Sequence, residues 1–160
     1  MKIEKIAGTY RERVTAQITE SWGAALVVSR GVLHDTRTLE GFVAVVDNAF
    51  AGYALYNIVD DDCELCVLEV LQSGHGIGSA LIREVLHAAK EAGCRRLWLI
   101  TTNDNTHAIR FYQRFGFDLR AVHINSMEAA RLLKPQIPLT GDDDIPIKHE
   151  FEFEILLILQ

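Results

Sequence analysis

The chain has 160 residues, of which 49% are hydrophobic and 24% charged, and we expect it to form one soluble domain over residues 1–160. The net charge of −6 argues against nucleic acid as a partner and suits a cationic or amine-bearing ligand. No apolar run approaches the roughly 20 residues of a membrane helix, and the N-terminus has no signal-peptide core, so we expect a cytoplasmic protein without a membrane partner.

The N-terminal half of the chain alternates between one helix and several strands. Val14, Ile18 and Trp22 recur at helical spacing, which predicts a helix over Thr9 to Trp22 that stops at Gly23. Ala25 to Val32 is predicted as one strand with a break at Gly31. Further strands are expected over Met1 to Ile6, Gly41 to Val46, Ala51 to Val59 and Cys63 to Leu71, with a hairpin turn at Asp47 and Asn48.

The C-terminal half contains a predicted right-handed strand–helix–strand unit. Its helix ends at Gly93, and the apolar run Leu97 to Ile100 is typical of a strand buried on both faces of a parallel pair. Elements predicted beyond it are a helix between Asn105 and Gly116, a strand over Phe117 to His123, a helix over Asn125 to Leu133, a loop over Pro135 to Pro146, and a strand over Lys148 to Leu159. The alternating apolar pattern of that last strand is suited to pairing across a homodimer.

Cys63 and Cys66 have the C-x-x-C spacing of many metal and redox sites. In a strand, however, residues three apart point to opposite faces. The remaining cysteine, Cys94, is isolated in the sequence. We therefore expect buried free thiols and no metal.

Three glycines at alternate positions, Gly74, Gly76 and Gly78, stand between the Cys63–Leu71 strand and the following helix. Backbone N–H groups at such a helix start point outward, and the helix dipole adds positive charge, so the loop predicts an anion site. A Rossmann fingerprint would need glycine at Ser79, and a P-loop would need Lys-Ser or Lys-Thr after Gly78, so neither motif fits.

Two segments resemble a known family. GHGIGSALI is similar to the coenzyme A loop of the GNAT acyltransferases, and NTHAIRFYQRFGF is similar to their signature Asn-x-x-Ala-x-x-Phe-Tyr-x-x-x-Gly-Phe. Where the family loop usually begins with Gln or Arg this chain has Ser73, and Gly74 is an additional glycine. The resemblance implies the GNAT-type α/β (α+β) fold, with a mixed central sheet of about six to seven strands flanked by helices and a parallel strand pair that splays apart.

The resemblance also implies acetyl-CoA as co-substrate. Its pyrophosphate is expected on the N–H groups of the loop residues Gly74, His75, Gly76, Ile77, Gly78 and Ser79. Its pantetheine arm is expected along the backbone of Val70 and Leu71, in contact with Asn105, which alternatively or additionally caps the next helix. His75 either adds positive charge to this site or is a solvated loop residue.

The implied reaction is attack of a primary amine on the thioester in a ternary complex; the acceptor is a small molecule, an amino acid or a protein. Tyr112 matches the family tyrosine that protonates the leaving thiolate. Glu69 is expected as the general base, on one strand face with Leu65 and Val67 and opposite Glu64, although a water relay is an alternative. A backbone N–H near Val70 is expected to stabilise the oxyanion.

The acceptor pocket is expected from the N-terminal half and the last strands. Arg30, His34 and Asp35 lie near a strand end, and we predict that at least one of them lines the acceptor cleft. The acidic segment around Asp142 either attracts a cationic acceptor or is simply solvated. The alternative to an enzyme is a non-catalytic acyl-CoA-binding regulatory module, which would bind acetyl-CoA without releasing its thiol.

Overall fold

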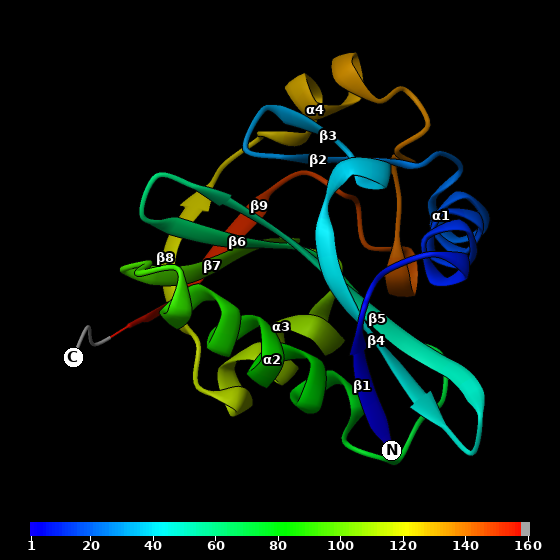
Figure 1. The fold of residues 1–160 in the computed structure, drawn as a ribbon. Helices are drawn as coiled ribbons and strands as arrows, with labels where there is room; N and C mark the ends of the chain where they lie inside the picture. Colours follow the sequence, from blue (N-terminus) through cyan, green and yellow to red (C-terminus); the bar gives the residue numbers. More distant parts are fainter. Residues whose placement is uncertain (158–160) are drawn as a thin grey trace.

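The computed structural model describes residues 1–157, which form a mixed seven-stranded sheet with helices on both faces (Figure 1). The strand order is β1-β4-β5-β6-β7-β9-β8, and β2 and β3 form a separate two-stranded sheet. The elements are β1 (Lys2–Lys5), α1 (Thr9–Trp22), β2 (Leu26–Ser29), β3 (Val32–Asp35), η1 (Thr36–Thr38), β4 (Glu40–Val46), β5 (Ala49–Val59), β6 (Asp62–Val70), α2 (Ile77–Glu91), β7 (Arg96–Thr102), α3 (Thr106–Phe115), β8 (Asp118–His123), α4 (Met127–Leu133), η2 (Asp142–Asp144) and β9 (Glu150–Leu156).

Local sequence signals account for most of these boundaries. Helix α1 ends as predicted at Gly23, which takes the left-handed conformation that glycine allows (φ 79°). Asp47 and Asn48 both have positive φ and join β4 to β5, as the hairpin prediction required. The predicted last strand is confirmed over Glu150–Leu156, and the end of that prediction, residues 158–159, lies outside the described residues.

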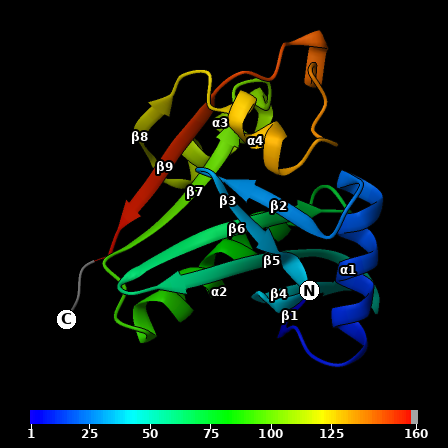
Figure 2. The same ribbon diagram turned by 90° about the horizontal axis from the view of Figure 1, so that it is seen from above.

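The prediction of one strand over Ala25 to Val32 is wrong. Arg30 and Gly31 both take positive φ (47° and 74°) and turn the chain back, so that β2 and β3 pair as an antiparallel hairpin. Asn-Gly is the usual signal for such a turn, and Arg30 does not carry it. Figure 2 shows the hairpin lying across one face of the main sheet, where β2 contacts β6.

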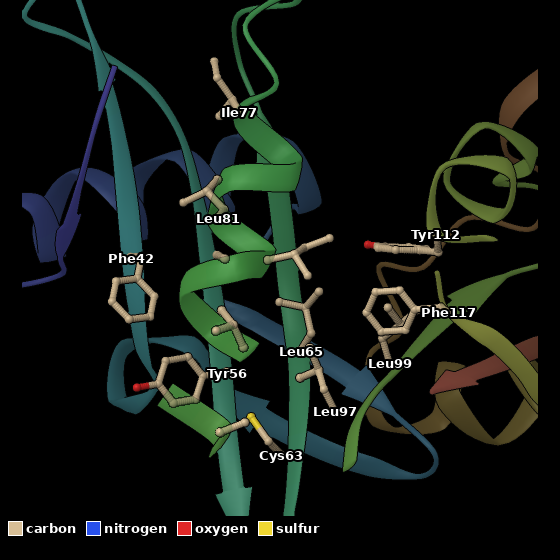
Figure 3. Packing of buried hydrophobic residues seen from close by; sticks show 14 of the residues in the cluster. Phe42, Tyr56, Cys63, Leu65, Ile77, Leu81, Leu97, Leu99, Tyr112 and Phe117 are labelled. Carbon is tan, nitrogen blue, oxygen red and sulfur yellow. The ribbon is translucent and has the colours of Figure 1, made fainter. Parts of the chain in front are cut away.

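The two faces of the main sheet bury different clusters. On one face, α2 and α3 cover a large apolar cluster that includes Ile77, Leu81, Leu97 and Tyr112 (Figure 3). On the other face, α1 packs on a second apolar cluster around Ile18. The β2–β3 hairpin lies on the same face, where β2 contacts β6. The sequence of β9 shows the division directly, because Phe153 packs into the first cluster while Glu150 and Glu152 point to the opposite face.

The parallel pair of strands separates after a short common stretch. β6 and β7 pair only at Asp62–Arg96, Cys63–Leu97 and Glu64–Trp98, whereas β7 stays paired with β9 over its full length. The predicted splay is therefore present. Pairing of the last strand across a homodimer is wrong, because β9 lies inside the sheet between β7 and β8.

A β-bulge in β6 changes which residues share a face. Leu65 pairs with Tyr56, but Val67 pairs with the preceding residue Leu55, so Cys66 is an extra residue in the strand. Leu65 accordingly packs on the α2 face and Val67 on the α1 face. The prediction that Leu65 shares a face with Val67 and Glu69 is therefore wrong.

Candidate active site

The glycine loop leaves backbone amides open at the start of α2. Gly74 and Gly76 have left-handed φ values of 95° and 64°, and a side chain at either position would point into open space. The first helical bond of α2 runs from Ala80 N–H to Gly76 C=O, and no side chain caps the helix. The amides of Ile77, Gly78 and Ser79 thus lack intrahelical acceptors, which is the arrangement that binds anions.

Close packing supports this loop from behind. A Cβ at Gly78 would lie 3.1 Å from the ring of Phe111 and 3.4 Å from the Val70 side chain, so only glycine brings the first turn of α2 this near to β6 and α3. His75 is exposed at the tip of the loop. The loop therefore combines a packed base with an open outer surface.

A cleft of about 700 Å³ opens where β6 and β7 diverge. Its walls include consecutive residues of the two strands: Leu65, Cys66, Val67 and Leu68 of β6, and Ile100, Thr101 and Thr102 of β7. Because the amide of Leu71 donates to the carbonyl of Ala51 on β5, the alternate amides of Leu68 and Val70 point the other way, toward the vacated place of β7. A linear ligand with amide groups can pair with those N–H groups.

Tyr112 and Asn105 reach this cleft from α3 and its start. The phenol of Tyr112 points away from its own helix (Figure 3), and its ring packs against Phe117 and Phe153. Burial raises the pKa of this phenol, so Tyr112 is protonated at neutral pH and holds a proton beside the cleft. Asn105 caps α3, because its side-chain oxygen accepts a hydrogen bond from the Ala108 N–H (3.1 Å), and it also lines the cleft.

Glu69 lies on the α1 side of β6, not among the residues that line the cleft. Its two carboxylate oxygens accept hydrogen bonds from the hydroxyls of Tyr53 (2.5 Å) and Ser21 (2.7 Å). Burial, followed by the hydrogen bond to Glu69, raises the pKa of Tyr53. Ser21 does line the cleft, so this hydroxyl stands between the cleft and the Glu69 carboxylate.

The three residues predicted for the acceptor pocket have different surroundings. Arg30 lies over the Trp98 ring and pairs with Glu152 at 3.3 Å, in a separate pocket along β9. Asp35 is held by the guanidinium and backbone N–H of Arg37, which lower its pKa to about 2. His34 alone points toward β6, where its ring lies beside Glu64 and Cys66.

Comparison with known proteins decides the family. The sequence matches the family model "Acetyltransferase (GNAT) family" over residues 8–117. The chain belongs to this family. It is 36% identical over 141 residues to the uncharacterized protein YxbD of Bacillus subtilis, covering 88% of this chain and 89% of YxbD.

Two further comparisons bear on the site of this GNAT chain. The spermine/spermidine N(1)-acetyltransferase of Bacillus subtilis is 33% identical over 76 residues, covering 42% of this chain and 50% of that enzyme. A GNAT acetyltransferase from Elizabethkingia anophelis, solved with acetyl-CoA bound, has a TM-score of 0.72 at 16% identity, covering 98% of this chain and 97% of that one, and so shares the fold.

Several residues of the GNAT cleft have roles that sequence reasoning did not give them. Asp104 is almost fully buried, accepts hydrogen bonds from the Thr102 hydroxyl (2.5 Å) and the Asp142 amide (3.2 Å), and lines the cleft. Glu150 lines it as well. The one lysine among the lining residues, Lys134, donates to the carbonyl of Leu26 (2.9 Å), and burial lowers its pKa. Of these cleft residues, only Asp142 was indicated by the sequence, because it belongs to the acidic loop.

A helix that spans a membrane needs a certain length and hydrophobicity. Among residues 1–157, none of the helices is both long and apolar enough to cross a membrane.

Proposed function

We propose that this protein is an acetyl-CoA-dependent N-acetyltransferase that acetylates a primary amine by direct attack in a ternary complex. The observation that carries the proposal is the juxtaposition of three parts: open amides at the start of α2, the cleft between the splayed strands, and the buried Tyr112 in that cleft. The likeness in fold to a GNAT structure with bound acetyl-CoA supports the same reading.

In this proposal the diphosphate of acetyl-CoA binds the amides from Gly74 to Ser79, with the exposed His75 beside it. The pantetheine arm enters the place vacated by β7, where the amide of Val70 is open. Leu71 follows Val70 at the end of this strand, and its own N–H is bonded to Ala51 on β5. Asn105 contacts the arm from the start of α3. The thioester then lies next to the bulge in β6 and to Tyr112.

The reaction needs a neutral amine, a stabilised oxyanion and a protonated thiolate. We propose that the attacking amine gives its proton to the hydroxyl of Ser21, which passes its own proton to Glu69. An open amide of β6 binds the oxyanion. When the C–S bond breaks, the Tyr112 phenol donates its proton to the sulfur, and the products are the N-acetylated acceptor and free coenzyme A.

The acceptor is proposed to be a cationic amine. Asp104, Asp142 and Glu150 supply carboxylates to the cleft, and the lysine there is tied to a carbonyl. The partial likeness to a spermine/spermidine N(1)-acetyltransferase agrees with this class of acceptor. His34 is the one residue of the predicted acceptor set that we retain near the cleft.

A thiol-release assay tests the proposal. The protein is supplied with acetyl-CoA and, separately, with polyamines, free amino acids and peptides with free N-termini. We expect amine-dependent release of coenzyme A that is fastest with a polycationic acceptor. Tight acetyl-CoA binding without release on any of these amines would favour the non-catalytic acyl-CoA-binding module, and absence of binding would refute both.

We propose a cytoplasmic location for the enzyme, and its three free cysteines are compatible with a reducing compartment. If the enzyme forms a homodimer, the described edges available to a second copy are β1 and β8, and β8 exposes Leu119 and Val122. Light scattering of the purified protein measures its mass in solution and so tests for the dimer.

A further inference from the structure

The β2–β3 hairpin brings a histidine against the bulge in β6. His34 on β3 and Glu64 on β6 are 9% and 7% exposed, and Cys66 is the bulge residue itself. The imidazole nitrogen of His34, a carboxylate oxygen of Glu64 and the sulfur of Cys66 all lie within 4.8 Å of one another. Two elements that are distant in the sequence, β3 and β6, thus meet at this point.

Polar atoms at this point are left without partners. The His34 Nε2 atom lies 3.4 Å from Glu64 Oε2 but makes no hydrogen bond within residues 1–157, and Glu64 Oε1 has no partner there either. Each unsatisfied buried polar group costs about 1–3 kcal/mol, so a cluster of them calls for a ligand. A cation among the three side chains would satisfy these atoms together.

The donor set is one that zinc prefers. Zn²⁺ binds thiolate, imidazole and carboxylate at about 2.0–2.3 Å in tetrahedral geometry, which places neighbouring ligand atoms about 3.3–3.8 Å apart. The 3.4 Å separation of His34 Nε2 and Glu64 Oε2 already falls in this range. Cys66 needs only a small approach, because it lies within the same 4.8 Å group.

We propose that His34, Glu64 and Cys66 form a binding site for Zn²⁺ or a similar divalent transition metal. Binding forms one bond to each side chain and releases the proton of the Cys66 thiol to solvent. Since Cys66 also lines the cleft, the fourth position faces the cleft and takes water or a neutral donor. Three protein ligands with one open position are typical of catalytic rather than structural zinc sites.

The C-x-x-C spacing is not what builds this site. Cys63 packs into the apolar cluster under α2, on the opposite face from Cys66, as the sequence predicted. The sequence expectation of no metal rested on that pair alone. The partners of Cys66 come from β3 and from Glu64, which only the hairpin and the bulge bring together.

Cobalt titration of the protein without acetyl-CoA tests the site independently of the proposed activity. We expect one Co²⁺ per chain, with the near-ultraviolet absorption of a cobalt–thiolate bond, displaced by Zn²⁺. Cys66→Ser should abolish that absorption. His34→Ala and Glu64→Gln should each weaken affinity by more than about 100-fold, beyond the loss seen for outer-shell partners.

Matched control variants distinguish this site from nonspecific metal binding. His87 and Glu91 form an exposed pair at the same 3.4 Å distance, without a cysteine. His87→Ala and Cys63→Ala should therefore leave the titration unchanged. Survival of the thiolate absorption in Cys66→Ser, or its loss in either control, would overturn the proposal.

X-ray absorption of zinc-loaded wild-type protein gives a test that needs no variant to fold. We expect one sulfur at about 2.3 Å and nitrogen or oxygen ligands at about 2.0–2.1 Å. A shell of nitrogen and oxygen alone, or failure of the wild-type protein to retain one equivalent of zinc, would show that the three side chains are not a metal site.

Discussion

The two faces of the central sheet bury different kinds of side chain. The face under α2 and α3 is built from apolar side chains such as Leu81, Leu97 and Leu99, and Tyr112 brings a hydroxyl from this face to the cleft. The face under α1 and the β2–β3 hairpin buries ionisable groups, among them His34 and Glu152. In the proposed function, the elements of the first face contribute shape and open backbone amides for the cofactor, and the second face contributes charge for the acceptor.

The difference between the two faces predicts which property a substitution on each face should change. On the apolar face, we expect a change of one hydroxyl or one loop glycine to act mainly on catalysis or cofactor binding. On the polar face, buried charges depend on one another, so removing one partner leaves the others uncompensated. The predictions below test the two faces in turn.

Removal of the Arg96 charge should have the largest effect. Its guanidinium lies at 3.0–3.1 Å from Asp62, Glu152 and Glu154, and it stacks over Trp98. Arg96→Met removes the cation that the three carboxylates share, while Arg30, Arg120 and Arg95 still pair with one carboxylate each. The free energy of unfolding should therefore fall by about 3 kcal/mol, the low end for a broken buried pair. Denaturant unfolding measures this loss.

The adjacent Arg95 is a matched control, because its side chain is 66% exposed and pairs with Asp61 at the surface. Arg95→Met should cost no more than about 1 kcal/mol. Equal losses for the two variants would mean that the polar face is no more interdependent than the surface.

The phenol of Tyr112 should have the next largest effect. Tyr112→Phe removes the proposed proton donor without changing the shape of the cluster, so kcat should fall about 10²-fold while the dissociation constant for acetyl-CoA stays the same. Tyr56→Phe is the control, since the Tyr56 hydroxyl bonds to Glu40 and is not among the cleft-lining groups. Wild-type turnover in Tyr112→Phe would remove this role.

Obstruction of the glycine loop should have a moderate effect. Gly76→Val places a branched side chain in the open space before α2, and the loss of one charge-assisted contact should weaken acetyl-CoA binding about tenfold. Gly93→Val is matched to it, because Gly93 has a similar left-handed φ (77°) at the other end of the helix region. Calorimetry should show weaker binding only for Gly76→Val.

The pH dependence contributed by Glu152 is the smallest of these effects. Burial opposes ionisation of Glu152, but hydrogen bonds from His123 and Arg96 and the nearby arginine charges outweigh it and lower its pKa. Its contribution to stability is therefore present above its unfolded pKa and lost as pH falls through the folded pKa. Urea unfolding should show Glu152→Gln less stable than wild type at pH 7, with the difference closing on acidification; a constant difference would contradict this.

Much of the fold follows from local signals in the sequence. The glycine loop, the Asp47–Asn48 turn and the splayed parallel pair were all predictable, because turn chemistry and a family motif are written in contiguous residues. The β2–β3 hairpin was missed because Arg30 occupies a left-handed position that usually carries Asn or Gly.

The polar side of the site was harder to predict. The bulge at Cys66 exchanges the faces of all later residues in β6, and strand periodicity alone gives no warning of it. Glu64 and Glu69 were therefore assigned to opposite faces although both lie on the face covered by α1 and the hairpin. The partners of Glu69, Ser21 and Tyr53, come from distant segments that only tertiary structure brings together.

The short paired stretch between β6 and β7 has a consequence for hydrogen exchange. With only three residue pairs joining the strands, the amides of Leu68 and Val70 have no strand beside them and should exchange quickly with deuterated water. The amide of Leu71, bonded to Ala51, should exchange more slowly. A ligand that lies in the gap as an eighth strand would reverse the contrast at these positions, and so its path through the molecule can be read residue by residue.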